Sequence, residues 1–366
     1  MSKYLIKLKP IENFFFGNEI NLGFHNKIKN YIVKSNCFPQ QTSILGMLRK
    51  EVLVKSETIE ENYCYSPEQK ELNKRLTGGW SFNINSVDDQ DFGVIKNLSP
   101  VFICNGKEYF MKIPKDHKKE NHKKQEKYNP LKMDEHAMNT SIGLITLPIE
   151  YKGKQGISDD FINVESKDIK SFDKIFREDS RVGIRKGKNG KTEDEAYYKI
   201  ISYKFSDDFQ FVFTAEIDMD FYIPEIDMDF DKYSNIVKLG GEGSSFKISF
   251  EKIDNSILDK INLNTNSDKH TRLVLLSDTY IAEDIYRHCS FAISNSVEFR
   301  NIETKIDNNV KCRDYNHRFK KISKKYKFLE KGSVLYSSGD ELEKLKARIN
   351  SFKNLKKIGY NSFIEV

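Results

Sequence analysis

The stretch "DDFQFVFTAEIDMDF" at 207–221 limits the folds open to this chain more than any other. Apolar side chains occupy every second position, and a β-strand places alternate side chains on opposite faces. We therefore predict a long strand with one apolar face, paired in a hairpin to the strand "YYKIISYKF" at 197–205. Its apolar positions are Phe209, Phe211, Phe213, Ala215, Ile217, Met219 and Phe221.

The other periodic segments add two strands and two helices to this hairpin. "KYLIKLK" (3–9) and "SFKISF" (245–250) alternate as strands. An apolar stripe over 44–52 predicts a helix that follows Pro39 and is capped by Thr42 or Ser43. Apolar residues at 230, 233 and 237 recur at helical spacing and predict a second helix. The resulting order is the ferredoxin-like (RRM-like) βαββαβ plan.

The length of 366 residues suits two domains. We predict an α+β protein with an N-terminal ferredoxin-like domain at 1–253 and a second, degenerate copy at 254–366. In the second copy "RLVLLSDTYI" and "GSVLY" predict strands, and "DELEKLKARI" predicts a helix. The irregular region at about 56–195 is interpreted as insertions, in which the polar stretch 115–130 is expected to be a mobile loop.

Composition narrows the class of protein. Lys plus Arg exceed Asp plus Glu by 60 − 54 = 6, which permits nucleic acid as a partner without requiring it. The segment 311–331 contains nine Lys or Arg and only two acids, with aromatic residues between them. Such a composition is typical of surfaces that neutralise phosphates and stack bases. A basic face that is simply exposed to solvent is the alternative. Five cysteines without a C-x-x-C pair argue against structural zinc and favour a reduced compartment. With no membrane-length apolar run and a charged N-terminus, the chain is expected to be cytoplasmic and free of membrane.

The glycine-rich stretch "LGGEGSSFKISF" at 239–250 raises the question of phosphate binding, because glycines let backbone N–H groups approach an anion. Dinucleotide and P-loop sites place their glycines after a strand and before a helix. Here the predicted order is helix, glycines, strand, which excludes both. A glycine cap accounts for Gly240, whereas Gly241 and Gly243 leave room for close approach of a ligand.

A second basic segment, "RKGKNGKT" at 185–192, ends like a Walker A loop but lacks its first glycine and the helix that should follow. We interpret it as an exposed basic finger suited to phosphates, with a solvated surface loop as the alternative. The basic residues of this finger are Arg181, Arg185, Lys186, Lys188 and Lys191.

Catalytic signals are weak. The repeated "EIDMDF" places Glu216, Asp218 and Asp220 on the polar face of a strand, where solvated or partner-facing acids are favoured over a metal site. The seven histidines show no metal-binding spacing, and no G-x-S-x-G elbow occurs. By position, His25 is the one candidate for a general base in metal-independent RNA cleavage.

Several stretches in a fixed order resemble one family. They are similar to the RAMP superfamily of CRISPR systems, and within it most similar to the third subunit of the type III-B Cmr effector complex. The stretches are "FFFG", "FPQQTSILGMLRKEVL", "EDSRVGIRKGKNGKTEDEAYYKI", "LGGEGSSFKISF", "LVLLSD", "KGSVLY" and the terminal "IGYN".

The resemblance implies a subunit without catalytic, metal or cofactor function that holds the 5′ handle of the CRISPR RNA. Its implied partners are that RNA, the target RNA, the large polymerase-nuclease subunit and the backbone RAMP subunits. It also implies a β-hairpin thumb at about 176–196 that wedges into the guide–target duplex. Carried over by position, the RNA-contacting residues are Gln41, Thr42, Ser43 and Arg49 on the first helix; Arg181, Val182, Gly183, Ile184, Arg185, Lys186, Lys188 and Lys191 in the thumb; and Gly240, Gly241, Gly243, Ser244 and Ser245 in the glycine loop.

Three other interpretations stay open at this point. The first is a RAMP endoribonuclease that processes precursor RNA with His25, and the second is a metal-dependent nuclease that uses the "EIDMDF" acids. Alternatively, the chain is the equivalent subunit of a type III-A or III-D complex, because sister families share much of the pattern.

Overall fold

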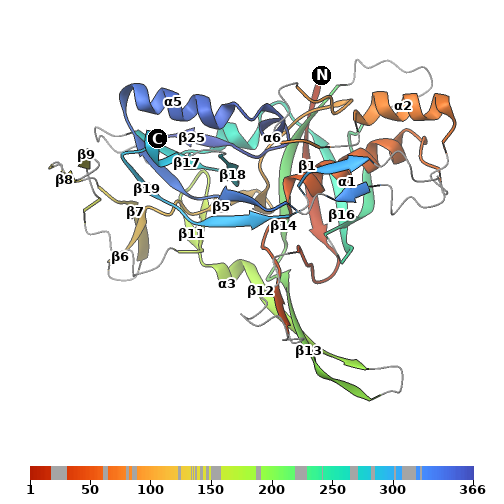
Figure 1. Ribbon diagram of the computed structural model, residues 1–366, viewed down its shortest axis with the longest axis horizontal. Coiled ribbons are helices and arrows are strands. Elements are labelled where there is room, and N and C mark those ends of the chain that lie inside the picture. The colour runs from red at the N-terminus through yellow and green to blue at the C-terminus, as the bar shows by residue number, and fades with distance from the viewer. Residues whose placement is uncertain are drawn as a thin grey trace.

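A computed structural model defines the architecture of the chain (Figure 1). The residues it describes are 1–17, 31–60, 65–79, 82–84, 89–122, 125–132, 134, 136, 138–140, 143–145, 148–149, 158–186, 191–218, 229–240, 242–263, 271–281, 285–300, 302–306, 319–321 and 324–366.

A nine-stranded sheet forms the centre of the molecule. Residues 209–217 of the strand predicted at 209–221 lie in its middle, with Phe209, Phe211 and Phe213 at most 2% exposed on one face. Met219 and Phe221 lie outside the described residues. In spatial order the strands are β11 (Ile169–Lys170), β10 (Phe161–Asn163), β5 (Glu108–Lys112), β4 (Phe102–Asn105), β14 (Phe209–Ile217), β1 (Ser2–Pro10), β16 (Ser244–Lys252) and β15 (Ser234–Leu239), and β3 (Ile95–Leu98) also pairs with β14.

Each face of this sheet is covered by a different layer. Helix α1 (Gln41–Lys55) buries Ile44, Leu45 and Leu48 against the aromatic face, and α2 (Pro67–Thr77) packs beside it. A second sheet covers the opposite face, where Val212 of β14 joins one apolar cluster with Val274. The strands of the second sheet, in order, are β19 (Phe291–Ile293), β24 (Val334–Ser337), β17 (Thr271–Leu275) and β25 (Phe363–Glu365).

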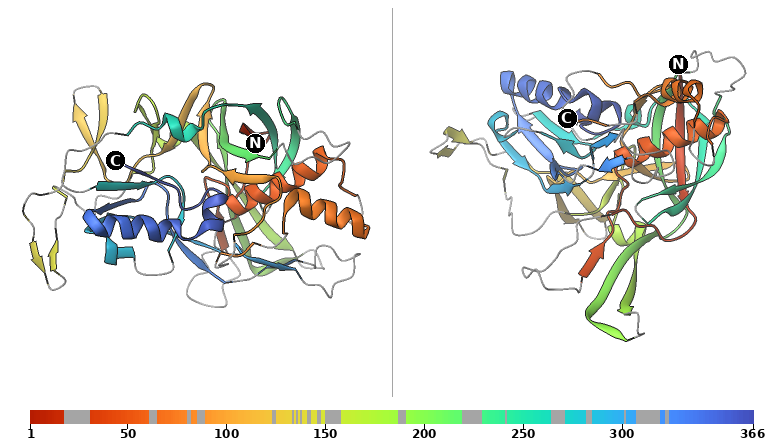
Figure 2. Two further views of the ribbon diagram at one scale, coloured as in Figure 1. Left: turned by 90° about the horizontal axis from the view of Figure 1, so that it is seen from above. Right: turned by 45° about the vertical axis from the view of Figure 1, so that its right-hand side comes forward.

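Helix α5 (Gly339–Asn350) closes the outer face of the second sheet through Leu342, Leu345 and Ile349. Figure 2 shows this helix and α2 toward opposite ends of the molecule. One small sheet contains β18 (Thr279–Tyr280), β23 (Tyr326–Leu329) and β20 (Ser296–Phe299). Three separate strand pairs are β6 (His117–His122) with β7 (Gln125–Pro130), β8 (Met138–Thr140) with β9 (Gly143–Ile145), and β21 (Thr304–Ile306) with β22 (Phe319–Lys321). The short helices are α3 (Phe172–Ile175) and α6 (Lys353–Lys357), and 3-10 turns occur at Ile257–Lys260 and Ile285–His288.

A hairpin of β12 (Phe176–Lys186) and β13 (Thr192–Phe205) projects from the body of the molecule (Figure 1). The short strand β2 (Tyr31–Lys34) pairs in parallel with β13 and widens the hairpin to three strands. Glycines and basic residues of the "R-V-G-I" segment therefore lie on an extended ribbon. We call this three-stranded ribbon the thumb.

Two predicted features of the N-terminal half are wrong. The segment before the glycine loop is strand β15 and not a helix, because pairing with the free edge of β16 buries Val237 and Leu239 at every second position. The predicted hairpin of 197–205 with 209–221 does not form either. Strand β14 has β1 on one side and β4 with β3 on the other, so both of its edges are occupied.

The region at 56–195 is more than a set of insertions. It supplies β3, β4, β5, β10 and β11 to the central sheet. The segment 115–130, expected to be a mobile loop, contains the paired strands β6 and β7. The α+β class is confirmed, whereas the plan of two ferredoxin-like domains is not.

Two aromatic residues of the basic stretch at 311–331 belong to the core. Tyr326 and Phe328 are 2% and 1% exposed and pack in the main apolar cluster, so they are not free to stack bases. Residues 311–318, with Tyr315, lie outside the described residues. No helix in the described part of the chain is long and apolar enough to span a membrane.

A buried ion pair joins the N-terminal half to the second sheet. The Asp116 carboxylate accepts hydrogen bonds from Arg272 Nε at 2.7 Å and from the Tyr336 hydroxyl at 2.8 Å, while His117 Nδ1 lies 2.8 Å away. Desolvation acts to raise the pKa of Asp116, but the His117 hydrogen bond and the Arg272 charge outweigh it and hold that pKa below its usual range. Asp116 therefore stays ionised, which makes the pair depend on both partners.

We expect Asp116→Asn to lower the free energy of unfolding by about 3–5 kcal/mol, because Arg272 would keep a buried charge without its counter-ion. The loss is measured by urea unfolding at neutral pH. Because the pKa of Asp116 is depressed, its contribution is present at neutral pH and disappears as the pH falls through the folded-state value. Asp208→Asn is the control, since the Lys9–Asp208 pair of 2.8 Å is exposed and should leave stability nearly unchanged. Equal unfolding midpoints for the two variants would contradict this account.

Candidate nucleic-acid interface

An aromatic cluster fixes the root of the thumb to the central sheet. The ring of Phe211 on β14 lies 4.8 Å from that of Phe205 in β13 and 5.9 Å from that of Phe38, which precedes α1. It also lies 5.3 Å from the Phe14 ring and 6.3 Å from the Phe246 ring of β16. The stretches "FFFG", "FPQQT", "YYKIISYKF" and "SFKISF", which lie in separate parts of the sequence, therefore converge on one residue.

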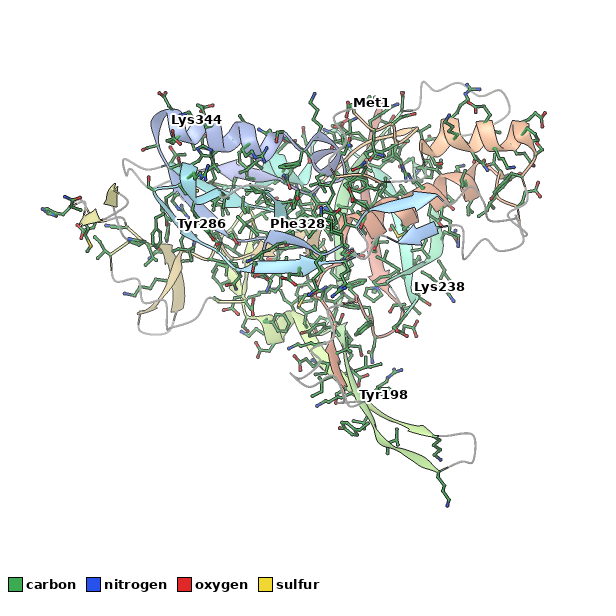
Figure 3. The ribbon with its side chains drawn as sticks, in the orientation of Figure 1. Met1, Tyr198, Lys238, Tyr286, Phe328 and Lys344 are labelled. Atoms are coloured by element: carbon green, nitrogen blue, oxygen red, sulfur yellow. The ribbon has the colours of Figure 1, made fainter. Side chains whose placement is uncertain are left out.

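The two faces of the thumb differ in character. Cross-strand register places Val182 and Ile184 on the same face as Tyr197 and Ile32, and these side chains are 55%, 55%, 43% and 55% exposed, respectively. On the other face, a Cβ on Gly183 would come within 2.0 Å of the Tyr198 ring, so the aromatic ring lies across the glycine. Figure 3 shows Tyr198 on the hairpin well below the body.

Basic side chains accompany this ribbon. Arg181 is exposed, and its Nε lies 3.5 Å from the Asp179 carboxylate. Lys186 and Lys191 are exposed on either side of the hairpin tip. The side chain of Arg185 and the whole of Lys188 lie outside the described residues.

The glycine stretch forms the turn between β15 and β16. Gly240 and Gly243 both have positive φ, at +86° and +65°, and Gly243 N donates to Gly240 O across the turn at 3.1 Å. A Cβ at Gly240 would lie 2.4 Å from the backbone oxygen of Phe15, whereas one at Gly243 would make only an ordinary contact of 3.7 Å with Lys238 Cδ. Gly240 thus packs against the backbone, and Gly243 has room for a small side chain. Gly241 lies outside the described residues.

The two serines after this turn hold the N-terminal segment. The buried Ser244 hydroxyl accepts from Phe15 N at 3.1 Å, and Ser245 N donates to Glu12 Oε1 at 3.1 Å. The next link toward the thumb root is Phe16 N, which donates to Ser35 Oγ at 2.8 Å. The turn is therefore joined to the root of the thumb through a few hydrogen bonds.

The first helix is placed as predicted, but two of its candidate residues are engaged within the protein. The buried Gln41 donates through Nε2 to Ser99 O at 3.1 Å and to Gly359 O at 3.2 Å. Arg49 donates to Gly79 O at 2.7 Å and lies 5.3 Å over the Phe92 ring. Thr42 and Ser43 are partly exposed; the N-cap is Gln40, so neither caps the helix.

A cleft of about 520 Å³ opens at the thumb root, between the two halves of the chain. Sequence reasoning missed it because its walls come from segments up to about 300 residues apart along the chain. The described residues around it are Lys34, Ser35, Asn36, Cys37, Phe38, Pro39, Gln40, Lys112, Asp159, Phe172, Glu178 and Tyr203 from the N-terminal half, and Asp278, Val297, Phe299, Glu330 and Lys331 from the C-terminal half.

Two of the three lysines in the cleft are neutralised by carboxylates. Lys34 lies 2.6 Å from Glu178, and Lys112 Nζ lies 3.1 Å from Asp159. Lys331 differs, because its ammonium lies 3.8 Å from the centre of the Phe38 ring. The stretches "FPQQT" and "KGSVLY", both part of the resemblance, meet through this contact.

The described residues do not support the predicted alternative of a metal site at the "EIDMDF" acids. Glu216 lies 3.6 Å from Lys3, and Asp218 lies 3.5 Å from Lys96, so these acids are ion-paired. Within the described ranges, no group of three or more His, Cys, Asp or Glu is arranged to hold a metal ion. Asp220 and His25 lie outside the described residues.

Comparison with known proteins identifies the class. One similar solved structure is a chain of the type III-B Cmr-beta complex bound to cognate target RNA and AMPPnP, with 15% identity, 99% of this chain and 96% of that chain covered, and a TM-score of 0.46. Another is a chain of the Csm3–Csm4 subcomplex of the type III-A interference complex, with 14% identity, 92% and 97% covered, and a TM-score of 0.34. No curated protein matches the sequence.

A match to a protein-family model identifies the family of the chain, which these distant structures do not. The model described as "CRISPR-associated protein (Cas_Cmr3)" matches residues 6–366, nearly the whole chain. The chain belongs to this family. The resemblance to the third subunit of the type III-B Cmr complex is thereby confirmed.

The two described glycines of the turn should respond differently to substitution. Gly240→Ala places a methyl group 2.4 Å from the Phe15 carbonyl oxygen, so the melting temperature should fall strongly and the N-terminal segment should loosen. Gly243→Ala meets only the flexible Lys238 side chain at 3.7 Å and should cost only about 1 kcal/mol for its left-handed conformation. Thermal unfolding of both variants measures the difference, and similar losses would show that Gly240 does not pack as described.

Proposed function

We propose that the chain is a non-catalytic RNA-binding subunit of a type III-B CRISPR effector complex that holds the 5′ handle of the CRISPR RNA. In this proposal it bridges the large polymerase-nuclease subunit to the backbone subunits, and its thumb wedges into the guide–target duplex. The observation that carries the proposal is the convergence of the thumb, the glycine turn and the cleft on the ring cluster of Phe211. Membership of the Cas_Cmr3 family supports the part of the proposal that places the chain in a CRISPR effector complex.

The thumb has the chemistry that this role requires. Basic side chains along an extended ribbon attract phosphates at any sequence, and the exposed apolar face offers Val182 and Ile184 to unstacked bases. The aromatic ring of Tyr198 across Gly183 provides a flat surface on the opposite face. The open backbone at Gly243 supports close approach of an RNA strand to the glycine turn.

Co-purification tests the proposal directly. The tagged chain, expressed with the other subunits of the system, should retain CRISPR RNA together with a large multidomain subunit. Retention of the protein partners without RNA would contradict the RNA-binding role and indicate a subunit that contacts only proteins. The type III-A or III-D alternative predicts backbone partners of those subtypes instead.

Incubation with repeat RNA separates the enzymatic alternatives. A structural subunit leaves the RNA intact with or without EDTA. Specific cleavage in EDTA that is lost in His25→Ala would support the endoribonuclease alternative. Cleavage abolished by EDTA would support a metal-dependent nuclease.

Neutralising the thumb should weaken RNA binding without changing stability. We expect the double variant Arg181→Gln and Lys186→Gln to reduce the slope of log affinity against log salt by about 1.5, because each exposed cation that neutralises a phosphate releases a counter-ion. The measurement is fluorescence anisotropy of labelled handle RNA at several salt concentrations. Lys344→Gln, on α5 far from Tyr198 in Figure 3, is the control and should leave the slope unchanged. An unaltered slope in the double variant would remove these side chains from the interface.

A further inference from the structure

The turn that carries Lys331 is held rigidly in the wall of the cleft. It links β23 to β24 at residues 330–333. Lys331 N donates to Asp278 Oδ1 at 3.0 Å, and Gly332 N donates to Leu275 O at 2.7 Å. Gly332 has φ of +83°, and its Cβ would meet Ile113 O at 2.9 Å, so the turn packs closely against the N-terminal half. The position of Lys331 is therefore fixed by the surrounding backbone.

The ammonium of Lys331 differs from its neighbours because, among the described residues, no carboxylate lies at ion-pair distance from it. Lys34, Lys112 and the nearby Lys115 each have a carboxylate within 3.1 Å. Within the part of the chain that the structure describes, no carboxylate lies within 4.0 Å of Lys331 Nζ, and its close contact is the Phe38 ring at 3.8 Å. Burial lowers the pKa of Lys331, with Asp278 and Glu330 opposing that shift. An enclosed cation whose nearest carboxylates lie beyond ion-pair distance costs free energy that an anionic ligand would offset.

The carboxylate of Asp278 restricts which anion fits. Asp278 lines the same cleft, and burial raises the pKa of its carboxyl. A bare phosphate would bring a second negative charge beside this acid, which disfavours it. A nucleotide carries both a phosphate and a base whose N–H groups donate to carboxylates. Its size also suits a cleft of about 520 Å³ with aromatic rings in its walls.

We infer that the cleft takes one nucleotide of the bound RNA, with its phosphate on Lys331 and the donor edge of its base toward Asp278. This inference rests on the proposed function, since RNA must reach the thumb root for the cleft to be filled. It adds a binding residue and a class of ligand to a site outside the predicted set. The motif "KGSVLY" then gains a role through its first residue.

Stability and affinity should change in opposite directions in Lys331→Gln. Losing an unpaired enclosed charge should leave the melting temperature unchanged or raise it, whereas a merely structural lysine would lower it. Affinity for labelled handle RNA should fall about tenfold, because a charge-assisted contact to phosphate is lost. Lys327→Gln on β23 is the matched control, being exposed and outside the cleft, and should bind as the parent chain does.

A second measurement reports occupancy of the cleft without relying on affinity. Cys37 lines the cleft and Cys289 does not, and both are partly exposed. Saturating handle RNA should slow alkylation of Cys37 by iodoacetamide about tenfold or more while leaving Cys289 unaffected, with mass spectrometry as the readout.

The outcomes separate this inference from the proposed function. If the parent chain binds handle RNA no better than scrambled RNA, the proposed function fails. If handle binding is intact but Lys331→Gln binds equally well, or Cys37 is alkylated at the same rate with RNA bound, only the nucleotide in the cleft is overturned. A joint loss of stability and affinity in Lys331→Gln would likewise overturn it in favour of a structural lysine.

Discussion

The ring of Phe211 is the contact on which the arrangement of the site depends. It lies in the central strand β14, and rings from the N-terminal segment, the start of α1, the thumb and β16 all pack around it at 4.8–6.3 Å. Aromatic pairs at such distances add stabilisation to that of buried area alone. Because the same residue supports the thumb and the wall of the cleft, the two features keep a fixed relation to each other.

The two halves of the chain contribute unequally to this site. The N-terminal half supplies the thumb, the glycine turn and most of the cleft, while the second sheet is held beneath by the buried Asp116–Arg272 pair. That pair is costly to bury and fails if either partner is removed. Tyr336 of β24 also donates to Asp116, and β24 begins directly after the turn that carries Lys331. The polar cluster around Asp116 thus helps to hold this wall of the cleft against the N-terminal half.

Local pattern predicted the strands and helices whose faces are half-buried. Strand β14, helix α1 and helix α5 follow directly from the spacing of apolar residues. It failed at 230–239, where apolar residues fit helical and alternating periods alike and only pairing with β16 decides for a strand. The RNA contacts of Gln41 and Arg49 came from the resemblance and stay a prediction; in the structure both side chains donate to backbone carbonyls. Lys331 belongs to the basic stretch 311–331, but nothing local distinguishes it from the other basic residues there, since its importance arises from Phe38, almost 300 residues away in the sequence.

Photo-crosslinking of the assembled complex tests the central claim most directly, namely that the handle runs along the thumb root and into the cleft. CRISPR RNA with 4-thiouridine at single handle positions would be crosslinked, digested and mapped by mass spectrometry. The account predicts crosslinked peptides that contain Tyr198 on the thumb and the turn at 330–333. Tyr286, 55% exposed on the C-terminal half, is an internal reference that should stay unmodified. Crosslinks at Tyr286 or α5, with none at the thumb or the turn, would contradict the account.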